Sequence, residues 1–192
     1  MSGKPDHLLR LGTSSFTAEG WEHGFYPKGM QPRDYLSYYA TQFNTLEIDA
    51  TFYRIPAVST VKGWHAKTPA DFLFALKTPQ DITHERVMID TDSLMNEFLR
   101  ATEPLGEKLG VILLQFPYFN KKAFAAPAEF LARLKTFLEK LPAALRPAAQ
   151  ARHCTGPDRS PLAAAPARMV RERRRSHHRF HIYPLAGRSQ GD

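Results

Sequence analysis

The sequence predicts an α/β fold in which parallel strands alternate with helices, as in a doubly wound sheet or a (β/α)₈ barrel. Strand-like and helix-like segments alternate four times within residues 1–147. One run, VILLQF, is apolar apart from its glutamine, which is typical of a strand buried on both faces. The 192 residues suffice for one domain with its own core, and the hydrophobic fraction of 43% is close to the globular average.

Four segments are typical of strands because they are short, apolar or alternating, and rich in β-branched or aromatic residues. They cover residues 8–16, 45–52, 71–77 and 111–116. Four other segments show helical signals, such as Pro32 near a helix start, Pro69 as a stop, and an apolar stripe from Phe130 to Leu141. The predicted helices cover residues 32–43, 58–69, 91–106 and 127–141.

The net charge of +7 is distributed unevenly along the chain. Residues 151–192 carry nine arginines and three acidic residues but no lysine, so they account for six of the seven net charges. The stretch MVRERRRSHHRF suggests a nucleic-acid-binding arm, but the nearly neutral body shows no electrostatic footprint for DNA or RNA. We therefore expect a domain over residues 1–147 and a basic, irregular or disordered tail over 148–192, with nucleic acid as an alternative partner.

Four polar residues stand on the strand faces opposite the all-apolar ones, at or near the carboxyl ends of the predicted strands. They are Glu47, Asp49, Lys77 and Gln115. Enzymes with a (β/α)₈ barrel keep their chemistry at this end, so we expect these side chains to converge on a site. The alternative interpretation is that they form charge pairs that fill the interior without catalysis.

Further candidates lie in the predicted loops. Arg54 follows the second strand and could clamp a carboxylate or phosphate, or lie on the surface. His84 follows the third strand and could exchange protons or bind a metal, or be merely exposed. Thr13 and Ser14, in GTSS, offer small side chains and N–H groups to an anion. The spacing of these residues matches no metal motif, and no cofactor is assigned.

Four ordered motifs resemble one protein family. The stretches GTSSFTAEGWEHGFYPKG, YYATQFNTLEIDATFYRIP, FALKTPQDITH and LGVILLQFP are similar, in order and spacing, to domain-of-unknown-function family 72, the YecE-like proteins related to sugar isomerases. The resemblance implies a (β/α)₈ barrel, of which residues 1–147 supply the N-terminal half, about four βα units. It also implies ligand-binding roles for Thr13, Ser14, Tyr53, Arg54 and Gln115 beside Glu47, Lys77 and His84. Asp49 stands where asparagine is common in the family.

The family pattern stops near residue 147. The codons permitted for residues 180–192, read one base later, can spell FTYIRWLGDRKG, which looks like a strand and loop late in this barrel. We therefore expect a frameshifted tail and a truncated, inactive chain.

The expected function is acid–base chemistry on a small sugar-like or phosphorylated ligand, with Glu47 as the base, Lys77 as an electrostatic stabiliser and His84 as a second proton carrier. A metal-dependent barrel hydrolase or nuclease is a further alternative. No apolar run reaches the length of a signal peptide or of a membrane-spanning helix, and the one cysteine excludes an internal disulfide. We expect a cytoplasmic protein, and the sequence assigns no oligomeric state.

Overall fold

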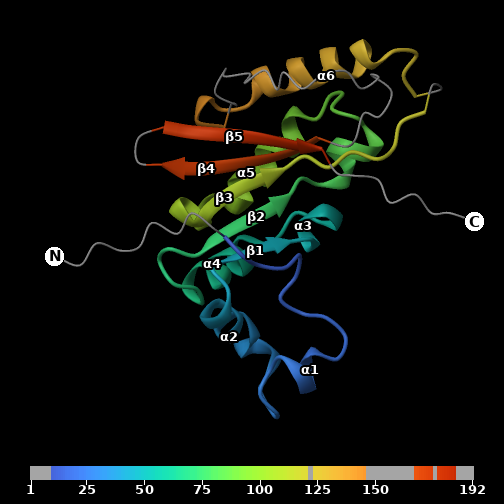
Figure 1. Ribbon diagram of the computed structural model, residues 1–192. Helices are drawn as coiled ribbons and strands as arrows, with labels where there is room; N and C mark the ends of the chain where they lie inside the picture. The colour runs from blue at the N-terminus through green and yellow to red at the C-terminus, as the bar shows by residue number, and fades with distance from the viewer. Residues whose placement is uncertain (1–9, 121–122, 146–166, 175–176, 185–192) are drawn as a thin grey trace, which may run out of the picture.

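The computed structural model describes residues 10–120, 123–145, 167–174 and 177–184, which form a three-stranded parallel sheet flanked by helices and a separate two-stranded hairpin (Figure 1). The helices are α1 (Trp21–Gly24), η1 (Pro32–Asp34), α2 (Tyr35–Gln42), α3 (Ala50–Tyr53), α4 (Val58–Ala66), η2 (Asp81–Glu85), α5 (Asp92–Thr102), η3 (Glu103–Lys108), α6 (Pro127–Lys140) and η4 (Ala143–Leu145). The strands are β1 (Thr45–Ile48), β2 (Leu73–Lys77), β3 (Leu109–Leu113), β4 (Ala167–Arg174) and β5 (His177–Pro184).

The parallel sheet has the order β1-β2-β3, and each strand is joined to the next through helices. Glu47 pairs with Ala75, and Ala75 pairs with Val111, so these three residues share one level of the sheet. This arrangement confirms the predicted fold class, an α/β fold corresponding to part of a (β/α)₈ barrel.

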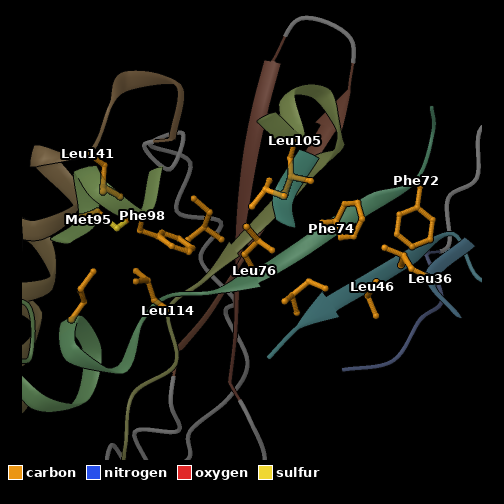
Figure 2. Close-up of a cluster of buried hydrophobic side chains, with 14 of the residues drawn as sticks. Leu36, Leu46, Phe72, Phe74, Leu76, Met95, Phe98, Leu105, Leu114 and Leu141 are labelled. Atoms are coloured by element: carbon orange, nitrogen blue, oxygen red, sulfur yellow. The ribbon is translucent and has the colours of Figure 1, made fainter. Parts of the chain in front are cut away.

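One face of the sheet supplies the core. Leu46 and Ile48 of β1, Phe74 and Leu76 of β2, and Ile112 of β3 are all buried. Figure 2 shows side chains of this face among those of the flanking elements, with Leu36 of α2, Met95 and Phe98 of α5, and Leu105 of η3 in the same cluster. The residues between them in sequence point to the other face, as strand alternation requires. That second face carries Glu47 and Lys77 and is half-buried, except at the buried Leu113.

The helix predictions are confirmed with small changes at their ends. The segment predicted over 32–43 forms η1 and α2, and the segments over 58–69 and 127–141 form α4 and α6. The segment over 91–106 divides into α5 and η3. Pro104 lies at the start of η3, where its missing N–H group cannot continue the α-helical hydrogen bonds of α5.

The first predicted strand, over 8–16, does not form within its described residues, 10–16. This segment nevertheless runs beside β1, because Glu47 N donates to Thr13 O (3.0 Å) and Leu11 N donates to the side chain of Asn44 (3.0 Å). The approach is close, since a Cβ atom at Gly12 would lie 2.0 Å from Thr45 O. The side-chain oxygen of Asn44, rather than a main-chain carbonyl oxygen, accepts the hydrogen bond from Leu11 N, so no regular ladder develops.

The second predicted strand, over 45–52, ends early. β1 stops at Ile48, and the chain turns into the short helix α3. The buried Thr51 hydroxyl lies 2.8 Å from both Ile48 O and Lys77 O and links the carboxyl ends of β1 and β2. The prediction of a strand as far as residue 52 is therefore wrong, because this local hydroxyl bond competes with extension of the strand beyond Ile48.

A buried lysine fastens η3 to the end of α4. Lys108 is 5% exposed, and its Nζ donates to the carbonyl oxygens of His65 (2.5 Å) and Thr68 (2.6 Å). Burial lowers the pKa of this ammonium group. The carbonyl groups at the end of a helix lack partners within the helix, and Lys108 supplies one with a favourable charge.

Part of the basic segment, for which irregular structure was expected, forms the antiparallel hairpin β4–β5. Arg168 pairs with Tyr183 at one end of the ladder and Arg174 pairs with His177 at the other. Strand β4 lies beside β3 (Figure 1), but the hairpin remains a separate sheet. The expected boundary at residue 147 lies outside the described residues.

Within the described part of the chain, no helix combines the length and the apolar composition needed to cross a bilayer.

We expect Thr51→Val to destabilise the protein by about 1–3 kcal/mol, because it leaves two strand-end carbonyl groups without their hydroxyl partner at nearly constant volume. Urea unfolding followed by circular dichroism measures the change. Thr60→Val, at an exposed position of α4, is the matched control and should change stability little. Equal effects of the two substitutions would contradict the role of the Thr51 bridge.

Candidate functional site

Lys77 lies between two carboxylates at the carboxyl end of the sheet. Its Nζ is 2.6 Å from Asp49 Oδ1 and 3.8 Å from Glu47 Oε1. The side chains of Lys77 and Glu47 are 19% and 11% exposed, so this is a largely desolvated group of charges. Three of the residues predicted to converge do so, because strand register places Glu47 and Lys77 on one face and Asp49 directly follows β1.

The main chain around these residues is held at several points. Glu47 N is bonded to Thr13 O, and the carbonyl group of Lys77 accepts the hydroxyl bond from Thr51. Thr78 N, just beyond β2, donates to Leu113 O (2.9 Å). The charged side chains therefore project from main-chain segments that are hydrogen-bonded to their neighbours, which limits how far these side chains can move.

His84 lies in η2, a π-helical turn that follows β2, rather than in an irregular loop. Its Nδ1 is 2.9 Å from the hydroxyl of the fully buried Thr83. Burial, and then the positive charge of Lys77, lower the pKa of His84 below its ordinary value of 6.5. The imidazole is thus neutral at neutral pH and able to accept a proton.

The ring of Phe52 contacts both Lys77 and His84. Lys77 Nζ is 5.9 Å from the centroid of its ring, and the His84 ring meets the same ring edge-to-face at 4.9 Å. Strand alternation does not indicate Phe52, because this residue belongs to α3 rather than to a strand. An aromatic residue shortly after Asp49, at the polar end of the predicted strand, is the one sequence signal that indicates Phe52.

Thr13 and Ser14, both predicted to bind a ligand, have different surroundings. Thr13 N and Oγ1 are 2.8 and 2.9 Å from the hydroxyl of Tyr39, so the Thr13 side chain is committed to α2. Ser14 is exposed.

The other three predicted ligand-binding residues are not joined to the charged cluster. Gln115 is half-buried and lies two residues beyond Leu113, the register partner of Lys77. Tyr53 is 73% exposed and touches the cluster only through Phe52, at 5.2 Å between ring centroids. Arg54 lines an open groove between α3, α4 and α5 whose lining does not include Glu47, Lys77 or His84.

Among residues 10–120, 123–145, 167–174 and 177–184, no three His, Cys, Asp or Glu side chains are grouped as a metal ion would require. The described part of the site can therefore supply proton acceptors, an ammonium group and an aromatic surface.

Comparisons with known proteins agree on one family. The profile of a family described as "Protein of unknown function DUF72" matches residues 10–156. The UPF0759 protein YecE of Escherichia coli is 35% identical over 118 residues, which cover 62% of this chain and 41% of that protein. The UPF0759 protein YunF of Bacillus subtilis is 33% identical over 106 residues, covering 51% of this chain and 38% of its own.

A crystal structure of a DUF72 family protein from Enterococcus faecalis has a TM-score of 0.52 and 27% sequence identity to this chain. The likeness covers 68% of this chain and 46% of that protein. The chain thus spans about two fifths of the length of the curated relatives it matches and just under half of the solved structure.

We expect the pKa of His84, measured by NMR titration of its ring protons, to lie below 6.5 and to rise in Lys77→Met, because the substitution removes a positive charge that disfavours the imidazolium. Lys62→Met, at an exposed position of α4, should leave the His84 pKa unchanged. An identical His84 pKa in Lys77→Met and the unsubstituted chain would contradict the electrostatic contact.

The lowered pKa of His84 also makes stability depend on pH. The unfolded chain binds this proton more tightly than the folded chain, so the free energy of unfolding falls as pH drops through about 6.5 towards the folded pKa. We expect the loss of stability between about pH 7.5 and about pH 5.5 to be smaller in His84→Gln than in His65→Gln. Urea unfolding at the two pH values measures the free energy of unfolding of each variant. An equal loss of stability in His84→Gln and His65→Gln would contradict the lowered pKa of His84.

Proposed function

The chain belongs to the DUF72 family of proteins of unknown function, and we propose that its described residues supply an acid–base site for a small sugar-like or phosphorylated ligand. The observation that carries the proposal is the Glu47–Lys77–Asp49 cluster with a neutral His84 beside the same aromatic ring. Such a grouping of charges at the carboxyl ends of parallel strands is where barrel enzymes act.

We assign separate roles to the two carboxylates. Asp49 makes the closer contact with Lys77 and holds the ammonium group in place, whereas Glu47 is the more deeply buried and acts as the base. The ammonium group of Lys77 stabilises negative charge that develops on the ligand when a proton is removed. His84 is the second proton carrier, because it stays neutral and is oriented by Thr83.

The proposal concerns the full-length proteins of the family, since this chain spans about two fifths of the length of the curated relatives that it matches. Nucleic-acid binding by residues 148–192 and metal-dependent hydrolysis are the alternatives. The described residues give the latter no grouped metal ligands.

A test is proton exchange with solvent. The 192-residue chain and full-length YecE of Escherichia coli are incubated in D₂O with a panel of aldoses, ketoses and their phosphates, and deuterium incorporation is followed by NMR. We expect YecE to exchange hydrogen at a carbon next to a carbonyl group, and the change equivalent to Glu47→Gln to lower the rate about 10²–10⁴-fold because it removes the base. The change equivalent to Lys77→Met should lower the rate without changing the exchanged position. The 192-residue chain, which we expect to be truncated and inactive, should show no exchange.

The matched control is the same substitution at an exposed glutamate of YecE outside the cluster, as Glu139 is in α6 of this chain. It should exchange at the unsubstituted rate. Undiminished exchange in the variant equivalent to Glu47→Gln would overturn the assignment of the base. A panel with no exchange in YecE would overturn the proposed chemistry.

A further inference from the structure

An open groove of about 720 Å³ runs between α4 and α5 and is bounded at one end by α3 and the loop that follows it. Small-molecule sites typically have volumes of about 300–1,000 Å³. The groove lies apart from the charged cluster, because Glu47, Asp49, Lys77 and His84 are not among its lining residues. It is therefore a candidate site of its own.

The groove has an apolar floor made by Ile55, Pro56 and Trp64, all half-buried. The Trp64 indole is stacked on Phe74 of the core, with 6.3 Å between ring centroids and 26° between ring planes. The core therefore holds the indole in place from behind. A flat apolar group would gain a rigid surface to pack on at little cost in side-chain entropy.

The rim of the groove carries two arginines. Arg54 follows α3 and Arg100 lies on α5, and both are exposed. Neither guanidinium group forms an ion pair or hydrogen bond with another described residue. Glu97, three residues before Arg100, is the one acidic residue of the lining, so the rim has one excess positive charge.

We propose that this groove binds an aromatic carboxylate, with the ring on the Trp64 floor and the carboxylate on Arg54 and Arg100. Guanidinium groups bind carboxylates through paired, charge-assisted hydrogen bonds. The apolar floor favours an anion that carries a flat ring over a small, strongly hydrated anion such as inorganic phosphate. The inference is independent of the proposed function, because it uses none of the residues assigned there.

The probe is 2-naphthoate, titrated into the full 192-residue chain and followed through the indole N–H resonance of Trp64 in ¹H–¹⁵N spectra. The chain has two tryptophans, and Trp21→Phe assigns the resonance. We expect a saturable shift with 2-naphthoate, and weaker binding of the uncharged 2-naphthalenemethanol. Inorganic phosphate should cause no shift.

Arg54→Gln and Arg100→Gln should each weaken 2-naphthoate binding about tenfold or more, as expected when a charge-assisted hydrogen bond is lost. Glu97→Gln should strengthen it. Arg33→Gln, at an exposed arginine paired with Asp34 on η1, is the matched control and should leave the affinity unchanged. Equal affinity for the acid and the alcohol, unchanged affinity in both arginine variants, or no saturable shift at Trp64 would overturn the proposal.

Discussion

The parallel register between β1 and β2 is the constraint that determines the relative positions of the charged residues. The last residue pair between β1 and β2 is Ile48 with Leu76. Lys77 therefore lies one residue beyond the β1–β2 pairing, level with Asp49, the first residue after β1. The Thr51 hydroxyl fastens both strand ends at this level. A shift of one residue would exchange the two faces of β2 and turn Lys77 towards the apolar core.

The cost of placing charge on a half-buried sheet face is offset within the same cluster. A desolvated ammonium group is costly unless an opposite charge lies close by, and Asp49 and Glu47 provide two. His84 avoids this cost by remaining neutral. The apolar face of the sheet carries no such cost, since Leu46, Phe74 and Leu76 are buried and have no polar side-chain group that needs a partner.

Strand alternation was sufficient to predict that Glu47 and Lys77 share a face, because a period of two leaves no other arrangement once the apolar residues face the core. It could not predict where regular structure ends. The side-chain bonds of Asn44 and Thr51 replace strand geometry on both sides of β1, and propensities do not report such bonds. Arg54, for which a surface position was one of the two interpretations, is exposed and lines the groove beside α3.

The π-helical geometry of η2 makes the orientation of His84 depend on the number of residues in the turn. Arg86 N donates to Asp81 O, five residues earlier, so this turn accommodates one residue more than an α-helical turn. Loss of a single residue between positions 81 and 83 would convert the turn to α geometry and rotate the following side chains by roughly 100° about the helix axis. The imidazole would then leave the Phe52 ring. Length of the segment, and not only the identity of its residues, thus specifies which group faces Lys77.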